Sequence, residues 1–333
     1  MRLRLAALAL ALAAAACGSD SRPPEPSFTF MPIAGMACAD GSGTGIGLSR
    51  GSNEVLVFLN GGGACWSQAE CDASPGPFGA ADLALGQQLL PGTILDRKLA
   101  ANPFAGFTLV FVPYCTGDVH AGDSVQTYAG TIWRHHGHRN LDAALAWIEA
   151  NLPHPARVVI SGSSAGGFGA LLAYDLVREC WPDSSGVGAA LVDDSGPTFD
   201  GTVIDTALRT AWWDAWGLDS TVTPVCPGCR NDLSDVWPTL SKAHPVDLFT
   251  LLSTTDDTTI EVFLGLQSST FTSALGTLAA KIGALPNART FRVTGVGHGL
   301  LASPASYQAG STPLVAWLDP IAVGTGAFVS VGP

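Results

Sequence analysis

Six short runs of apolar and β-branched residues recur along the chain, and most of them are separated by longer segments of mixed polarity. The runs are Glu54–Leu59, Phe107–Val112, Arg157–Ser161, Ala189–Asp193, Asp247–Ser253 and Thr290–Gly295. Continuous apolar runs of this length are typical of strands that are buried on both faces of a parallel sheet. We therefore expect these six runs to form one mostly parallel central sheet.

Helix-like stretches lie between several of these runs. They are Asn140–Leu152, for which Asn140 is the expected N-cap, Gly167–Cys180, Val203–Trp216 and Ser268–Ile282. Strands that alternate with helices predict an α/β fold, with helices flanking the sheet. No Pro/Ser-rich break divides the chain after residue 30, so we expect a single domain over residues 31–333. The segment Asp219–Pro245 is expected to be an irregular insertion.

The first 30 residues follow a different pattern. Arg2 and Arg4 precede the apolar stretch Leu5–Ala16, which has the length of a secretory signal and falls short of the roughly 20 residues that span a bilayer. The alanines directly before Cys17 resemble a bacterial lipoprotein cleavage site. We expect a lipoprotein-type signal peptide at 1–17, a lipid on Cys17 as the only membrane attachment, and a flexible tether at 18–30. Ordinary secretion is the alternative, and both place the protein outside the cytoplasm.

Composition and charge narrow the function classes. With 47% hydrophobic residues the chain can bury a large core, and a net charge of −12 excludes nucleic acid as a partner. Export permits disulfides, and seven of the eight cysteines follow Cys17, so at least one of them lacks a partner within the chain. Cys65 and Cys71 are expected to pair; Cys226 and Cys229 either form a bridge or bind a metal.

One serine has the sequence context of a nucleophile. Ser164 lies in Gly162-Ser163-Ser164-Ala165-Gly166, a G-x-S-x-G pattern between an expected strand and an expected helix. That context predicts a nucleophile elbow, in which a strained turn exposes the serine and flanking glycines permit close backbone approach. A second match centred on Ser49 precedes a strand instead, so Ser164 is the candidate nucleophile.

The other parts of a serine esterase occur in the expected chain order. The glycine run Gly61–Gly63 follows an early strand, and its amides, with the amide of Ala165, are candidates for an oxyanion hole. His298 lies in a glycine-rich loop after the last expected strand and is the candidate base. His154 and His244 have prolines beside them and are interpreted as surface-loop residues.

The acid is expected directly after the strand Asp247–Ser253. Asp257 is the preferred candidate there, and Asp256 is the runner-up. Asp193 and Asp194 also end a strand, but that strand is one too early for the usual acid position.

Two clusters, one of histidines and one of tryptophans, can be interpreted in more than one way. His135, His136 and His138, with His120 as a fourth donor, have the composition of a zinc site. Trp212 and Trp216 are spaced i,i+4 on an expected helix, where they line an acyl pocket, stack on a sugar or pack in the core.

Taken together, five segments resemble the pectin acetylesterase / Notum family of carboxylesterases. They are "FLNGGGACWSQAEC", "VFVPYCTGDVHAG", "HHGHRN", "ISGSSAGGFGALL" and "DDTTIEVF", which occur in the family's order between about Cys38 and His298. The resemblance implies an α/β-hydrolase-like fold and no cofactor.

Carried over by position, the resemblance implies particular roles. Ser164 becomes the nucleophile, His298 the base and Asp257 the acid, while oxyanion amides fall on Gly62, Gly63 and Ala165. The family usually has a glutamine three residues after its aspartate, where this chain has Ile260, so Asp256 stays open. Asn60, Ala64 and the missing cysteine near His298 also depart from the family.

These observations predict an exported, monomeric serine carboxylesterase with a Ser-His-Asp triad that acts on acetyl or other short-chain esters. Its substrate would be an acylated carbohydrate or another ester. The alternatives are a non-catalytic, surface-tethered binding protein on the same fold, and a metal-dependent hydrolase that uses the histidine cluster.

Overall fold

The computed structural model describes residues 27–72, 76–326 and 328–333. The expected signal peptide at 1–17, with its lipid site at Cys17, and residues 18–26 of the expected tether lie outside the described residues. The first strand begins at Thr29, so the last two residues of the expected tether belong to the sheet. They pair there with Leu48 and Gly47, and this pairing moves the start of the ordered domain ahead of residue 31.

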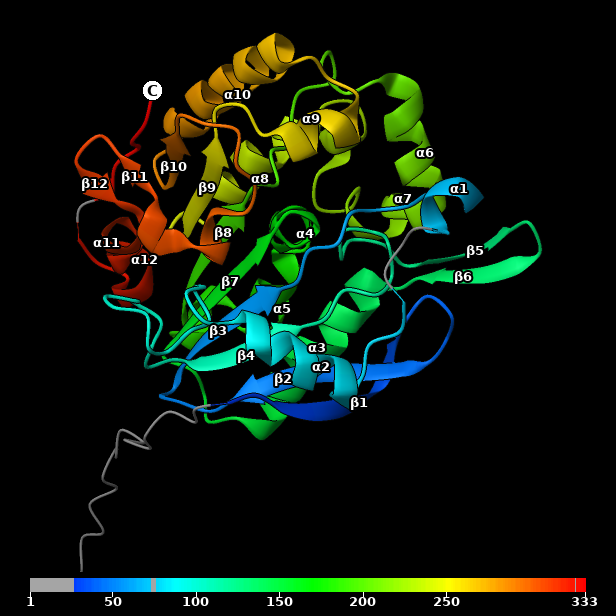
Figure 1. Cartoon of the computed structure of the whole chain (residues 1–333), viewed down its shortest axis with the longest axis horizontal. Coiled ribbons are helices and arrows are strands. Elements are labelled where there is room, and N and C mark those ends of the chain that lie inside the picture. The colour runs from blue at the N-terminus through cyan, green and yellow to red at the C-terminus, as the bar shows by residue number, and fades with distance from the viewer. Residues whose placement is uncertain (1–26, 73–75, 327) are drawn as a thin grey trace, which may run out of the picture.

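An eight-stranded sheet forms the centre of the molecule, in the order β1-β2-β4-β3-β7-β8-β9-β10 (Figure 1). The strands are β1 (Thr29–Ala37), β2 (Gly43–Ser49), β3 (Glu54–Leu59), β4 (Thr108–Val112), β7 (Arg157–Ser163), β8 (Gly188–Asp194), β9 (Leu248–Thr254) and β10 (Ala288–Val293). From β4 to β10 all neighbours are parallel, whereas β1–β2 and β2–β4 are antiparallel. All six expected strands are present.

The sequence pattern missed the two antiparallel strands. Three of the seven residues of β2 are glycine, and β1 contains Pro32, so neither segment has the apolar run that marks a buried strand. A short β5 (Ser124–Tyr128) and β6 (Thr131–His135) hairpin projects from the body of the molecule, and β11 (Gln308–Ala309) pairs with β12 (Thr312–Pro313).

Helices cover both faces of the sheet. They are α1 (Gln68–Cys71), α2 (Ala80–Gly86), α3 (Gly137–Asn151), α4 (Ala165–Leu172), α5 (Asp175–Cys180), α6 (Thr206–Trp216), α7 (Leu218–Thr221), α8 (Val236–Ala243), α9 (Thr258–Leu264), α10 (Ser268–Gly283), α11 (Leu314–Trp317) and α12 (Asp319–Val323). The side chains of Val55 and Val57 enter one core with α3, α4, α6 and α10, and Leu56 and Phe58 enter the other with α2, α11 and α12. This alternation explains the unbroken apolar run of β3.

Three details of the expected helices are corrected. The helix α3 begins at Gly137, ahead of Asn140, whose side chain instead exchanges two 2.9 Å hydrogen bonds with the backbone of Ala37. The stretch Gly167–Cys180 is divided between α4 and α5. The insertion at Asp219–Pro245 contains α8 and two 3₁₀ turns, Pro227–Arg230 and Leu233–Asp235.

Three disulfides staple the domain. They join Cys38 to Cys115, Cys65 to Cys71 and Cys226 to Cys229, and Cys180 is the free cysteine of the described residues. The expected Cys65–Cys71 pair is confirmed, as is the bridge alternative for Cys226 and Cys229. Disulfides of this number are typical of proteins outside the cytoplasm. Within the described ranges, no helix is both long and apolar enough to cross a bilayer.

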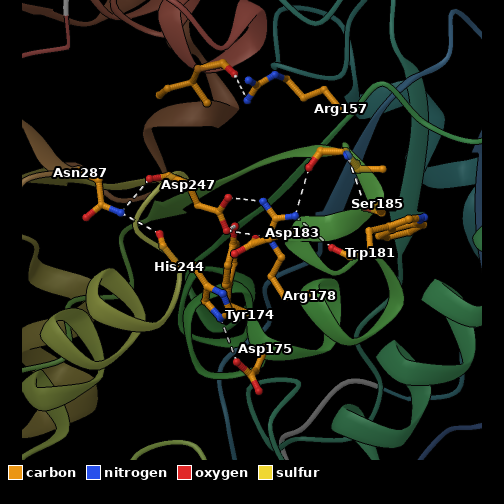
Figure 2. A network of polar contacts seen from close by, with 12 residues as sticks. Arg157, Tyr174, Asp175, Arg178, Trp181, Asp183, Ser185, His244, Asp247 and Asn287 are labelled. Carbon is orange, nitrogen blue, oxygen red and sulfur yellow. Dashed lines mark hydrogen bonds and ion pairs between the residues drawn. The ribbon is translucent and has the colours of Figure 1, made fainter.

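A buried ion pair connects segments at the end of the sheet where the parallel strands begin, called here the amino edge (Figure 2). Asp247, directly before β9, accepts hydrogen bonds from Arg178 Nε at 2.8 Å and from Tyr174 Oη at 2.7 Å, and it pairs with Arg178 Nη2. Arg178 Nη1 donates to the carbonyl oxygens of Trp181 and Val187. The guanidinium therefore ties α5, the strand β8 and the strand β9 together.

We expect Arg178→Met to lower the free energy of unfolding by about 3–5 kcal/mol, because the substitution leaves Asp247 buried without its cation. The side chains of Arg178 and Asp247 are only 5% and 1% exposed, so water cannot replace the lost partner. Urea denaturation followed by circular dichroism measures the change. Arg230→Met, which removes an exposed cation beside Asp219 and Asp214, serves as the control and should leave the midpoint unchanged. A wild-type midpoint for Arg178→Met would contradict the assignment.

Candidate active site

Ser164 occupies a strained turn between β7 and α4. Its φ of 60° and ψ of −122° lie in a region that non-glycine residues rarely adopt. A Cβ at Gly162 would overlap the backbone of Gly166, and one at Gly166 would overlap the carbonyl oxygen of Leu59. Only glycine fits at both positions, so the sequence expectation of a strand–turn–helix elbow around Ser164 is met.

Ser49, the second match to the same pattern, has a different setting. It ends β2, is 1% exposed, and its hydroxyl accepts a hydrogen bond from Arg97 Nε at 3.2 Å. The strand β2 is followed by β3 and not by a helix, so Ser49 does not stand in a strand–turn–helix elbow.

Asp257 and His298 meet at the same edge of the sheet as the serine turn. His298 Nδ1 lies 2.8 Å from Asp257 Oδ2, and Asp257 Oδ1 accepts the backbone N–H groups of Thr259 and Ile260 at 3.1 Å each, capping α9. Because a carboxylate only accepts, Nδ1 carries the proton and Nε2 of the neutral ring is left with a lone pair. The imidazole is therefore oriented to take a proton.

Asp256 points elsewhere. Its carboxylate accepts the hydroxyl of Ser268, and this hydrogen bond lowers the pKa of Asp256. Of the two aspartates that the sequence left open, the structure brings Asp257 to the histidine.

The serine turn and the histidine loop are neighbours. A Cβ at Gly299 would lie 4.0 Å from the Cβ of Ser163, one residue from each candidate. In the described part of the chain no direct hydrogen bond joins Ser164 to His298. Hydrogen bonds between a catalytic serine and its base are often longer before substrate binds.

The glycine run approaches Ser164 closely. A Cβ at Gly61 would lie 2.6 Å from the carbonyl oxygen of Ser163, and Gly62 and Gly63 have φ values of 153° and 76°. Gly63, Ser164 and Ala165 line one cavity of about 80 Å³, whereas Gly62 is not among its lining residues. Ala165 begins α4, so its N–H has no partner in the helix and is available to an anion.

The rest of that cavity is lined by four apolar side chains and Thr259. Its walls include Val119, Phe168 and Phe263, and the same three side chains line a second cavity of about 20 Å³ with Trp212, Trp213 and Trp216. Trp212 stacks on Trp216 with 5.6 Å between ring centroids, and on Phe263 with 5.7 Å. Trp212 and Trp216 are thus core residues that line the second cavity.

The histidine cluster does not form a metal site. His135 is fully buried, its Nδ1 donates to Thr116 O at 2.9 Å and its Nε2 lies 3.0 Å from Tyr128 Oη; burial lowers the pKa of His135 to about 4. His120 Nε2 donates to Asn60 O at 2.9 Å.

Among the described residues, metal-ligand spacing occurs only in two other groups: Cys65, Cys71 and His135, and Asp183, His244 and Asp247. The first contains a disulfide, and the second contacts the Arg178 cation. The alternative in which His135, His136 and His138 hold a metal is not favoured, because the described residues do not bring the ligand atoms of these three side chains together. His244 lies in a loop after α8, as expected, and its partly buried ring pairs with Asp175.

Sequence reasoning missed one group at this edge. Asp194, which ends β8, accepts a hydrogen bond from Ser163 Oγ at 2.6 Å, and burial raises the pKa of its carboxyl. The doublet Asp193–Asp194 at a strand end was the available signal.

Known proteins resemble the chain in sequence. A family model described as Pectinacetylesterase matches residues 26–281, a range that contains Ser164 and Asp257 and ends before His298. The palmitoleoyl-protein carboxylesterase NOTUM of Schmidtea mediterranea is 31% identical over 134 residues, which are 38% of this chain and 25% of that protein. The NOTUM of Homo sapiens is 30% identical over 143 residues, 39% of this chain and 27% of that protein.

Pectin acetylesterase 7 of Arabidopsis thaliana is 26% identical over 152 residues, which are 45% of this chain and 38% of that protein. The matched part of this chain therefore spans between a quarter and two fifths of the length of these relatives.

The fold is shared with solved structures. The Wnt deacylase Notum from Drosophila, in one crystal form, gives a TM-score of 0.67 at 18% identity, covering 92% of this chain and 95% of that one. A second crystal form gives a TM-score of 0.66 at 20% identity and covers 94% and 96%. The expected α/β-hydrolase-like fold is confirmed.

Proposed function

Because the chain belongs to the pectinacetylesterase family, we propose that it is an exported serine carboxylesterase that hydrolyses acetyl or other short-chain esters. The observation that carries the proposal is the 2.8 Å pair of His298 and Asp257 at the edge where Ser164 stands in a strained turn. The three groups have the residue types and the chain order of a Ser-Asp-His triad.

In this reaction His298 Nε2 takes the proton of Ser164 Oγ as the oxygen attacks the ester carbonyl. Asp257 holds the imidazole in the required tautomer and stabilises the imidazolium. The developing oxyanion is received by the N–H groups of Gly62, Gly63 and Ala165. The imidazolium then protonates the leaving alcohol, and a water activated by His298 releases the acid from the serine. No step requires a cofactor.

Ser164→Ala should reduce turnover of p-nitrophenyl acetate by residues 18–333 at least about a thousandfold, because the acyl acceptor is lost. Ser161→Ala is the matched control: this serine lies in the same strand, and its hydroxyl only donates to Val192 O. It should retain turnover, as should the wild type in excess chelator. Equal activity in Ser164→Ala and the wild type would show that another residue is the nucleophile. A wild type inactive on all esters would favour the surface-tethered binding protein.

The size of the pocket supports a short acyl group. The cavity beside Ser164 measures about 80 Å³, whereas ligand pockets usually measure roughly 300–1,000 Å³. The relatives act, by name, on pectin acetyl groups or on a palmitoleoyl protein. The acetyl group of an acetylated carbohydrate is a better match to this volume than a long acyl chain, so we infer an acylated carbohydrate as substrate.

We expect kcat/KM on p-nitrophenyl esters to fall beyond about four acyl carbons, because the cavity beside Ser164 is small and Phe263 is one of the side chains that line both it and the second cavity. Phe263→Ala joins the two cavities and should raise the ratio of octanoate to acetate turnover about tenfold, the scale of one or two methylenes in an apolar pocket. Val262→Ala alters the adjacent side chain, which is 83% exposed, and should leave the ratio unchanged. A wild type that prefers C8 or longer would refute the short-chain assignment.

The protein acts outside the cytoplasm and is attached to a membrane through a lipid on Cys17. The three disulfides support export, and the alanines before Cys17 support lipidation. The full-length protein expressed in a bacterium should partition into the detergent phase of Triton X-114. Cys17→Ala should move it to the aqueous phase. A wild-type protein found in the aqueous phase would indicate ordinary secretion, and a Cys17→Ala protein that stays in the detergent phase would refute attachment through Cys17.

A further inference from the structure

A buried carboxylate lies between the serine turn and the histidine loop. Asp194 is 0% exposed at the end of β8, and its Oδ2 accepts Ser163 Oγ at 2.6 Å and Leu301 N at 2.9 Å. Its Oδ1 accepts Leu300 N at 2.8 Å and Ser195 Oγ at 3.2 Å. Four donors converge on one carboxyl group, and two of them come from the segment directly after His298.

The backbone at Asp194 makes the connection complete. Its carbonyl oxygen accepts a hydrogen bond from the N–H of Ser164 at 2.8 Å, so the candidate nucleophile is also bonded to Asp194 through the backbone. Ser195 has a φ of 64°, a strained value for a non-glycine residue, and its hydroxyl accepts Gly299 N at 3.0 Å. Strain of this kind persists only where surrounding contacts impose it.

We propose that Asp194 is a positioning residue that fixes the His298 loop against the Ser164 turn. Its role rests on the proposed esterase reaction. Since no direct hydrogen bond joins the two candidates in the described residues, their relative placement depends on a third group that contacts both segments. The Asp194 carboxylate contacts both segments: it accepts hydrogen bonds from Ser163, beside the candidate nucleophile, and from the backbone of Leu300 and Leu301, beyond the candidate base.

A carboxylate is required there because every partner is a donor. An ionised carboxylate offers acceptor sites on both oxygens, and hydrogen bonds to it are stronger than those to a neutral group. An asparagine would direct its NH₂ group at the backbone N–H of either Leu300 or Leu301, and that N–H cannot accept a hydrogen bond. A displacement of about 1 Å between reacting groups costs on the order of a hundredfold in rate.

The adjacent Asp193 provides a matched control. It is equally buried, but its Oδ1 accepts only Gly196 N and its Oδ2 has no partner. Burial raises the pKa of Asp193 well above its usual value. Asp193→Asn therefore changes the same strand end without removing a shared acceptor.

The test compares Asp194→Asn with Asp193→Asn in residues 18–333. Asp194→Asn should lower kcat for p-nitrophenyl acetate about a hundredfold with KM within about threefold. It should also speed amide hydrogen exchange in the peptide 296–303, where two N–H groups lose their acceptor. Asp193→Asn should leave kcat and exchange near the wild-type values. Ser163→Ala should lower kcat by about three- to tenfold in the wild type and not at all in the Asp194→Asn background.

Several outcomes overturn the proposal. They are a wild-type kcat with unchanged exchange in Asp194→Asn, or an equal loss in Asp193→Asn, which would indicate general damage to the strand end. If Asp194→Asn does not fold, full activity in both Ser163→Ala and Ser195→Ala would refute it. If the wild type hydrolyses no ester, the proposed function fails, and the exchange comparison of the two asparagine variants still decides whether Asp194 holds the loop.

Discussion

Close backbone packing at the carboxyl edge of β3 and β7 is the constraint on which the site depends. Leu59 pairs with Gly162 in the parallel register of these strands, and Gly166 lies against the carbonyl oxygen of Leu59. A side chain at either glycine would separate the strand end from the turn. Because there is none, the Ser164 turn and the glycine run after β3 lie side by side, and the first amides of α4 face the same cavity.

The two edges of the sheet contain buried carboxylates that are stabilised in different ways. At the amino edge, Asp247 is paired with the permanent cation of Arg178, and this ion pair has a structural role in connecting the strands. At the carboxyl edge, Asp257 and Asp194 are satisfied by N–H and O–H donors, and the cationic partner available to Asp257 is an imidazole. An imidazole can both accept and donate a proton, so the carboxyl edge contains the group that the proposed proton transfer needs.

The pocket is assembled from segments far apart in the sequence. Trp216 of α6 donates its indole N–H to the carbonyl oxygen of Cys65 at 2.7 Å, which connects the pocket wall to the segment after the glycine run. The Cys65–Cys71 disulfide holds that segment, and Phe263 of α9 stacks on Trp212. Rigid aromatic packing of this kind fixes the shape of the cavity walls.

The sequence by itself determined the features that depend on local pattern. Unbroken apolar runs marked six strands, and the strand–glycine–helix context separated Ser164 from Ser49. The odd number of cysteines after Cys17 required at least one of them to lack a partner within the chain. Tertiary structure decided the rest: the glycine-containing β1 and β2, the Cys38–Cys115 bridge, the pairing of Asp257 instead of Asp256 with His298, the divergence of the histidine cluster, and the position of Asp194. Local pattern fixes burial and backbone shape, because it acts through neighbours along the chain. Which carboxylate meets which donor depends on contacts between residues up to 107 positions apart, and only the folded chain brings these together.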